Sequence, residues 1–305
     1  MRTVLTGGTG VIGRAAVAAL VDAGHDVVVV SRSASAADLV AGLGAVPVSG
    51  DVLDIDSLVA AYDGADALIN LATRMPVGSN ARHRGVWRQH DRLCGRGVAN
   101  VVEAARRAGV RRVVQGSTSV LYADQGNGWI TEQSPVAITP VTEPSAVAES
   151  QVQEYCCGSR AGVVLRFGGI VGDDRQTRQW VRAAGNGRRV GIGQPSDWTH
   201  VIHTDDLGGA VLAALHAPSG VYNVGAEPVR RHDLVQGCAD AAQVASGAFI
   251  GPWGRWFIGE RLEPLSRSLR VSADHFAAQT GWRATRPQFD ASWFAAALPL
   301  HDLRR

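Results

Sequence analysis

The sequence predicts a doubly wound α/β fold, in which helices cover both faces of a parallel sheet, followed by a smaller C-terminal lobe. Short apolar segments alternate with segments of helical periodicity through residues 1–170. A glycine-rich turn separates the first apolar segment from the first helical one. With 305 residues, of which 46% are hydrophobic, the chain can also bury a large core.

The first strand, turn and helix carry the strongest signal. A short strand over Thr3–Leu5 leads into a turn with three glycines, and a helix is expected over Arg14–Ala23. Glycines let the backbone turn tightly, approach a pyrophosphate and pack the helix on the strand, while N–H groups at the helix start face the phosphates. The pattern therefore predicts a dinucleotide-binding unit of the Rossmann type. Its predicted phosphate contacts are Gly7, Gly10, Val11, Ile12 and Gly13.

The second strand, His25–Val30, ends at Ser31 and Arg32. A site that prefers NAD usually has an acidic side chain there, which binds the ribose 2′-hydroxyl. A guanidinium can instead form charge-assisted bonds to a 2′-phosphate. The sequence thus favours NADP(H) over NAD(H), with Ser31 and Arg32 at the ribose, although a solvated surface arginine is the alternative.

Further along the chain, the alternation of strands and helices continues. Helices are expected over 36–43 and 56–62, with strands over 46–48 and 67–71, and Asp54 or Asp56 is expected to cap the helix over 56–62. Ligands of such sheets bind at the carboxyl ends of the strands. The residues that end the fourth strand are therefore predicted to face the cofactor; these are Leu71, Ala72 and Thr73.

Several motifs, taken in order, resemble the extended short-chain dehydrogenase/reductases, the family of NAD-dependent epimerases and dehydratases. They are TGGTGVIG (6–13), GDVLD (50–54), NLAT (70–73), VVQGSTSVLYAD (113–124), LRFGGIVG (165–172), VIHTDDL (201–207) and VYNVG (221–225). The resemblance implies that Asp51 and Val52 lie along the adenine. It also implies a cofactor-binding core over 1–170, to which 201–225 return, and a substrate-binding lobe built from 171–200 and 226–305.

The resemblance also implies where the substrate contacts lie. The polar loop 74–85 borders the substrate in this family, which makes Arg74, His83 and Arg84 candidate contacts. An aromatic segment over 247–262 is a second candidate, because it could close over an apolar substrate or pack the lobe. Neither segment has a recognisable nucleotide-sugar signature, so we expect a smaller or more apolar organic substrate.

The catalytic residues depart from the family pattern. Thr118, four residues before Tyr122, matches the family's catalytic serine or threonine, whose hydroxyl binds the substrate oxygen. The YxxxK motif of the family is missing. In that motif the lysine holds the nicotinamide ribose and lowers the tyrosine pKa. Aligning Glu154 with a glutamate that often follows the lysine places Ala146 at the tyrosine and Ser150 at the lysine.

Two side chains are candidate replacements for the missing proton donor. Glu149 lies three residues after Ala146 and so close to the same helix face, and His200 titrates in a suitable pH range. A surface glutamate and a structural histidine are the alternative interpretations. Cys94 also departs from the family, since it stands where an asparagine is common.

Three functions remain open from the sequence. The first is an NADP(H)-dependent oxidoreductase that acts on a small carbonyl or hydroxyl substrate with an unconventional proton donor. The second is a non-redox isomerase, dehydratase or cyclase of the same fold. The third is a non-catalytic dinucleotide-binding sensor.

Composition narrows the range of partners. A formal charge of +2 with no basic block argues against nucleic acid, and the scattered histidines have no metal-ligand spacing. No apolar run reaches membrane-spanning length, and the first strand begins without a signal peptide before it. Four cysteines without a disulfide pattern favour reduced thiols, hence a cytoplasmic protein. We expect a small-molecule substrate and allow for a homodimer.

Overall fold

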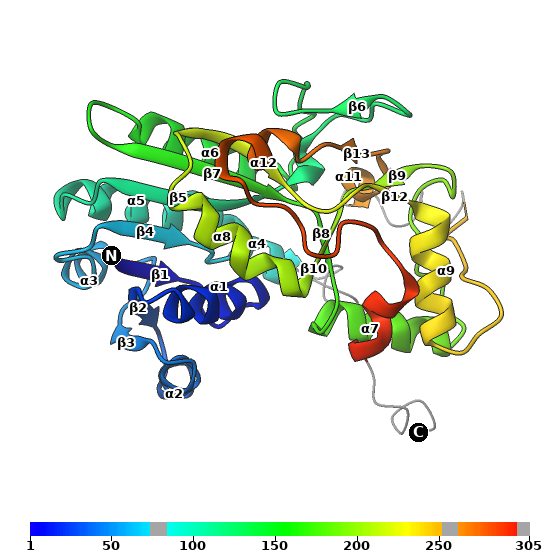
Figure 1. Ribbon diagram of the computed structural model, residues 1–305, viewed down its shortest axis with the longest axis horizontal. Coiled ribbons are helices and arrows are strands. Elements are labelled where there is room, and N and C mark those ends of the chain that lie inside the picture. Colours follow the sequence, from blue (N-terminus) through cyan, green and yellow to red (C-terminus); the bar gives the residue numbers. More distant parts are fainter. Residues whose placement is uncertain (74–83, 252–261, 298–305) are drawn as a thin grey trace.

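The computed structural model describes residues 1–73, 84–251 and 262–297. Within them, the central sheet has seven strands in the order β11-β7-β5-β4-β1-β2-β3, all paired in parallel (Figure 1). The order reverses between β1 and β4, which is the crevice where ligands of doubly wound sheets bind. The strands are β1 Arg2–Thr6, β2 Asp26–Ser31, β3 Val46–Ser49, β4 Ala67–Asn70, β5 Arg112–Thr118, β7 Ala161–Phe167 and β11 Gly220–Val224.

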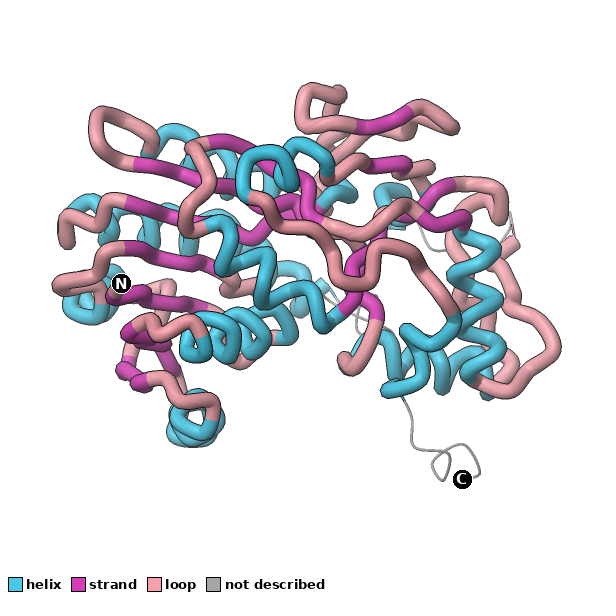
Figure 2. The backbone as a smooth tube through the Cα atoms, viewed as in Figure 1, coloured by secondary structure: helices cyan, strands magenta, loops and turns pink. Residues whose placement is uncertain are grey.

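Helices cover both faces of this sheet, as expected (Figure 2). One face is covered by α1 Val11–Asp22, α2 Ala34–Gly42, α8 Leu207–Ala214 and α12 Asp274–Thr280. The other is covered by α3 Ile55–Ala61, α5 Val98–Arg107 and α6 Glu143–Tyr155. Neighbouring strand residues point to opposite faces, so Leu5 packs in the first layer and Val4 in the second. The predicted fold class is confirmed.

The first helix begins earlier than the sequence suggested. Gly10 is its N-cap, and α1 starts at Val11 rather than at Arg14. Val11, Ile12 and Gly13 therefore form the first helical turn. The prediction that Asp54 or Asp56 caps the third helix is correct for Asp54, whose carboxylate accepts hydrogen bonds from the N–H groups of Asp56 and Ser57.

A late segment of the chain packs directly on the first helix. The helix α8 lies against α1, and at Gly208 the two backbones approach closely. A Cβ at Gly208 would overlap the Ala15 carbonyl and lie 2.9 Å from the Ala19 Cβ. The return of residues 201–225 to the core thus includes a helix-to-helix contact as well as β11.

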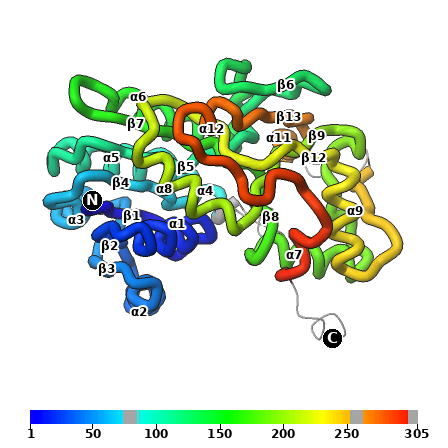
Figure 3. Tube along the Cα trace, viewed as in Figure 1, coloured from blue at the N-terminus to red at the C-terminus, as the bar shows by residue number. Residues whose placement is uncertain are grey.

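The smaller lobe has its own apolar core, in which Val181, Leu234 and Trp293 are buried. In Figure 3, α7, α9 and the last described turn lie side by side although they are far apart in the chain. Phe276 on α12 packs instead in the main core, so the residues after 226 contribute to both cores. The elements of the smaller lobe are β8 Gly169–Val171, α7 Arg175–Gly185, β9 Trp198–Thr199, β12 Val229–Arg230, α9 Arg231–Ala241 and η6 Ala291–Ala297. From this lobe, β10 Val201–His203 and η4 Thr204–Asp206 lead back to α8.

Shorter elements connect these layers. They are α4 Arg84–Arg92, the π-helical turn η2 Leu93–Gly97, η3 Ser119–Leu121, β6 Trp129–Ile130, α11 Glu263–Ser266 and β13 Arg270–Val271. In the parts of the chain described, no helix has both the length and the apolar character needed to cross a membrane.

Candidate dinucleotide and substrate site

The glycine turn is a backbone cradle with no room for side chains. Gly7 has φ of +77°, and its carbonyl accepts a hydrogen bond of 3.1 Å from the Gly10 N–H. A Cβ at Gly7 would lie 2.5 Å from the carbonyl carbon of Leu71, and one at Gly13 would overlap the Gly7 carbonyl oxygen. Strand end, turn and helix therefore meet at backbone contact distance, as a pyrophosphate site requires.

The N-terminus of α1 is open to an anion. Its N-cap is Gly10, so no side chain caps the helix, and no acidic residue lies in its first turn. The first N–H groups of a helix have no partner within the helix, and the helix dipole favours negative charge there. The turn, which contains all five predicted phosphate contacts, thus fits a dinucleotide pyrophosphate.

Only two of the four residues predicted to contact the adenosine have exposed side chains that lie close to each other. The Arg32 guanidinium lies 4.0 Å from the Asp51 carboxylate at the ends of β2 and β3, and both side chains are substantially exposed. Ser31 is buried, and its hydroxyl donates to the Val29 carbonyl, so it points into the protein. Val52 is buried in the second layer. Arg32 and Asp51 are therefore the side chains available to an adenosine.

The carboxyl end of β4 passes beside the turn. Leu71 donates its N–H to the Thr6 carbonyl, and the Ala72 nitrogen would lie 2.6 Å from a Cβ at Gly7. Asn70 holds this end in place through a 2.7 Å hydrogen bond to Gln115 on β5. Thr73 follows as an exposed residue. The predicted contacts Leu71–Thr73 thus lie next to the phosphate cradle.

The predicted catalytic residue Thr118 stands at the same sheet edge. In the register of β4 and β5, Asn70 lies opposite Gln115. Thr118 ends β5 three residues after Gln115, and Thr73 follows three residues after the end of β4. The Thr118 hydroxyl is half-buried and accepts only a long hydrogen bond, 3.4 Å, from the Val120 N–H. It therefore retains its donor for a substrate oxygen.

Glu149, the first candidate proton donor, is held in a buried ion pair. Its carboxylate accepts from Arg166 Nη2 at 2.6 Å, and its Oε1 also accepts from the Ser117 hydroxyl at 2.5 Å. Burial alone would lower the pKa of Arg166, but the hydrogen bond and charge of Glu149 raise it. The Arg166 guanidinium also stacks on Tyr122, 4.7 Å from the ring centroid. This geometry links α6 to β5 and β7 and gives Glu149 a positioning role.

His200, the second candidate, is enclosed by backbone. The ring is buried, and neither nitrogen has a hydrogen-bond partner among the described residues. A Cβ at Gly225 would overlap its Nε2. Burial lowers the pKa of His200 to about 3, so the ring is neutral near pH 7. These features do not support a role in proton transfer.

The inward face of α6 differs from the one that the sequence alignment suggested. Ser150 is exposed and donates to Glu154 at 3.0 Å, whereas Ser145 and Glu149, four residues apart, are buried. Ser145 rather than Ser150 therefore faces the interior. Tyr155 is buried and donates to the Val110 carbonyl, so this side chain belongs to the core. In either register the helix offers no tyrosine–lysine pair, and all 30 basic residues of the chain are arginines.

The sequence prediction missed a histidine at this edge. His90 on α4 is buried, and its Nδ1 lies 3.2 Å from the Thr73 hydroxyl and 3.7 Å from the Cys94 sulfur. Burial lowers the pKa of His90, and it raises the pKa of the Cys94 thiol to about 11. Cys94 lies in the π-helical turn η2, a local irregularity that is frequent at functional sites. The spacing of four between His90 and Cys94 was the available signal.

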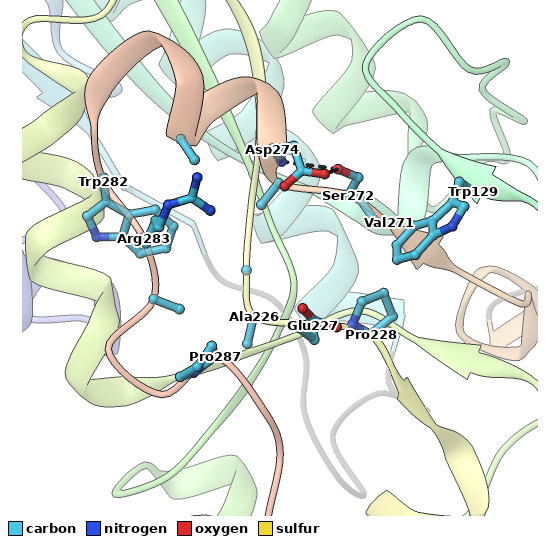
Figure 4. Close-up of a pocket in the computed structure, with 14 residues that line it drawn as sticks. Trp129, Ala226, Glu227, Pro228, Val271, Ser272, Asp274, Trp282, Arg283 and Pro287 are labelled. Atoms are coloured by element: carbon cyan, nitrogen blue, oxygen red, sulfur yellow. Dashed lines mark hydrogen bonds between the residues drawn. The ribbon is translucent and has the colours of Figure 1, made fainter.

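Some predicted contacts lie outside the described residues. These are Arg74, His83, the Arg84 side chain and most of the aromatic segment. The smaller lobe contains a separate hollow of about 260 Å³ between Trp129 and Trp282, which stand on opposite sides of it in Figure 4. No residue of the glycine turn lines this hollow, so it is distinct from the dinucleotide cradle. Among the described residues, no cluster of His, Cys, Asp or Glu could hold a metal ion.

Comparison with known proteins agrees with this geometry. The profile of the NAD dependent epimerase/dehydratase family matches residues 3–225. A 3-diazoavenalumate denitrifying reductase from a Streptomyces species is 30% identical over 229 residues, which are 71% of this chain and 73% of that protein. The chain therefore belongs to the NAD dependent epimerase/dehydratase family, which confirms the resemblance to extended short-chain dehydrogenase/reductases.

Solved structures show the same fold. UDP-glucose 4-epimerase from Thermotoga maritima, with UDP-glucose, matches with a TM-score of 0.79 and 17% identity over 97% of both chains. MoeE5 in complex with UDP-glucose and NAD matches with a TM-score of 0.76 and 22% identity, again over 97% of both chains. The family relationship supports an NAD(P)-dependent oxidoreductase of this fold; the preference between the two dinucleotides stays a prediction.

Proposed function

We propose that this protein is an NADP(H)-dependent reductase of a small organic substrate, whose hydride acceptor needs no proton from the protein. The observation that carries the proposal is the contrast at one sheet edge. A complete dinucleotide cradle lies beside titratable side chains that are ion-paired, as Glu149 is, or buried and neutral, as His90 and Cys94 are. The proposed edge therefore has a place for the cofactor, while Glu149, His90 and Cys94 are not poised to donate a proton.

Different residues of the chain would bind different parts of the cofactor. The open N-terminus of α1 would hold the pyrophosphate, and Arg32 would pair with the 2′-phosphate while Asp51 lies near the adenine. Leu71–Thr73 would support the other half of the dinucleotide. A bound reduced nicotinamide supplies one hydride, which carries two electrons. Thr118 would donate its hydroxyl hydrogen bond to a polar group of the substrate and orient it.

The lack of a proton donor limits the kind of hydride acceptor that the site could reduce. Reduction of a carbonyl leaves an alkoxide, which must take up a proton, and general acid catalysis typically contributes about 10²–10⁴-fold to such steps. A diazonium carbon is different. The hydride electron pair forms the new C–H bond, the C–N bond breaks, and dinitrogen leaves with the electron pair of the C–N bond, so no proton is consumed.

The Streptomyces relative is named as a denitrifying reductase of a diazo compound, and it is the relative that supports this choice. We extend that class to this chain: an arenediazonium compound is the proposed acceptor. The substrate would be small, because the segments that border the sheet edge have no recognisable nucleotide-sugar signature.

The test uses a carboxylated arenediazonium salt, with NADPH deuterated at its hydride position. We expect deuterium on the arene and release of dinitrogen, much faster than in the absence of protein. The corresponding benzaldehyde should be reduced slowly or not at all. Thr118→Val should lower turnover and leave NADPH binding intact. Faster reduction of the aldehyde, or equal diazonium reduction with and without protein, would overturn the proposal.

A second candidate is a non-redox isomerase, dehydratase or cyclase, which the lack of a tyrosine–lysine pair also favours. It predicts that the cofactor is never consumed and that no deuterium reaches the product. A non-catalytic sensor would bind NADPH tightly and turn over no substrate. A cofactor consumption assay separates the first proposal from both of these.

A further inference from the structure

We propose that Thr73, His90 and Cys94 form a positioning cluster that holds the nicotinamide ribose in place of the absent lysine. This inference rests on the proposed use of a nicotinamide dinucleotide. It concerns Thr73, which follows the end of β4, His90 on helix α4, and Cys94 in the π-helical turn after α4.

The three groups share one contact point. His90 Nδ1 lies within 3.2 Å of the Thr73 hydroxyl and 3.7 Å of the Cys94 sulfur, and its Nε2 is 3.8 Å from the same sulfur. His90 and Cys94 are buried, whereas Thr73 is exposed. The cluster therefore extends from the buried side chains of His90 and Cys94 to the exposed Thr73 at the sheet edge.

The directions of the hydrogen bonds depend on the protonation states and on which imidazole nitrogen carries the proton, and the proposal places this proton on Nε2. Burial keeps the imidazole neutral, and the thiol is protonated because its pKa is raised to about 11. With the ring proton on Nε2, Nδ1 accepts the hydrogen bond from the Thr73 hydroxyl. The Thr73 oxygen then turns its lone pairs outward, where it can accept a hydrogen bond from a ribose hydroxyl.

The topology places Thr73 at the correct half of the dinucleotide. Arg32 and Asp51 mark the adenosine end at β2 and β3, and the glycine turn after β1 marks the pyrophosphate. The next strand in the sheet is β4, followed by β5 with Thr118. A dinucleotide that continues in this direction brings its second ribose to the end of β4, where Thr73 stands.

This arrangement explains how the edge can function without an ammonium group. The family's lysine is expected to hold the ribose, and Ser150, which the sequence alignment places at its position, is uncharged. A neutral hydroxyl fixed by a buried imidazole provides one directed hydrogen bond. It adds no positive charge beside a cationic substrate such as a diazonium ion, which an ammonium would repel.

The test compares the binding of two ligands by calorimetry: NADPH, and 2′,5′-ADP, which lacks the nicotinamide ribose. Thr73→Val should weaken NADPH binding roughly three- to tenfold, the range for one lost hydrogen bond, and leave 2′,5′-ADP binding unchanged. His90→Phe should show the same selective loss. His90→Asn, which retains an acceptor, should recover part of it. Thr131→Val, at an exposed threonine far along the chain, is the matched control.

Each outcome decides between defined alternatives. A selective loss of NADPH affinity in the Thr73 and His90 variants, with unchanged thermal unfolding, supports the cluster. Parallel loss of both ligands, or no loss in either variant, overturns it. If one variant fails to fold, the other gives the same comparison. If the wild-type protein binds neither ligand, the proposed dinucleotide function itself fails, which is distinguishable from failure of the cluster alone.

Discussion

The glycine turn and the inward face of α6 belong to the same sheet edge, yet they obey different constraints. At the turn, backbone meets backbone, and a Cβ at Gly7 or Gly13 would collide with the carbonyls around it. On α6, the inward positions accept any side chain that packs or finds a partner, as Ser145 and Glu149 do. Steric constraints fix residue types, whereas a chemical role can be lost while the fold is retained.

The largest loss of stability is expected from a substitution at Glu149, on the inward face of α6. Glu149→Ala removes one partner of a buried ion pair and leaves the Arg166 charge uncompensated, so the free energy of unfolding should fall by about 3–5 kcal/mol. Urea unfolding measures it. Glu154→Ala, at an exposed glutamate of the same helix, is the control and should change stability by no more than about 0.5 kcal/mol. Equal effects would show that the pair is not structural.

At the turn, the corresponding change is Gly13→Ala. The added methyl would overlap the Gly7 carbonyl, so we expect a loss of roughly 1–3 kcal/mol in stability and no measurable NADPH binding. Gly42→Ala is the matched control, because a Cβ there meets nothing within 4 Å. Urea unfolding and calorimetry give the two readouts. NADPH binding by the Gly13 variant at wild-type affinity would contradict the cradle assignment.

The adenosine end sharpens the comparison, because it is held by a side chain rather than by backbone. If Arg32 pairs with a 2′-phosphate, Arg32→Ala should weaken NADPH binding by roughly 10–100-fold and NADH binding much less. Arg107→Ala, at an exposed arginine of α5 paired with Glu103, is the control. Competitive titration with both dinucleotides measures the ratio. Equal losses for NADPH and NADH would refute the 2′-phosphate assignment.

The last prediction concerns the interior residue His200 and the change in the free energy of unfolding for each pH unit. Because burial lowers its pKa to about 3, the unfolded chain takes up a proton below about pH 6.5 that the native ring does not. Stability is therefore complete above pH 6.5 and falls toward pH 3, by at most about 1.4 kcal/mol per pH unit. His200→Leu should flatten this slope in urea unfolding series. An unchanged slope would show that His200 is protonated in the native state.

The fold could be predicted because its signals are local and steric. The turn from Gly7 to Gly13 and the apolar strands left little choice of architecture, and the Asp54 cap was visible as a residue type at a helix start. The start of α1 was misplaced by three residues, because Gly10 acts as an N-cap without a side chain. Such a cap has no polar residue to mark it.

The candidate site could be predicted only in part, because its chemistry depends on partners distant in sequence. The sequence made Glu149 a candidate proton donor, but in the structure its carboxylate oxygens accept hydrogen bonds from Arg166 and Ser117. His200 looked titratable until Gly225 was found to lie against it. His90 was missed because Thr73, its partner, belongs to another element. Residue type predicts what a group can do in water, but the fold decides which state it adopts.

The close contact between α1 and α8 has a consequence for the order in which the protein matures. Helix α1 has its N-terminus at the proposed phosphate site, and the surface it packs against includes Gly208, which is made much later in synthesis. A nascent chain that ends before α8 would leave the inner face of α1 without this cover. Since contacts between distant residues form late in folding, the affinity for a dinucleotide should emerge only as the last strand of the sheet joins it.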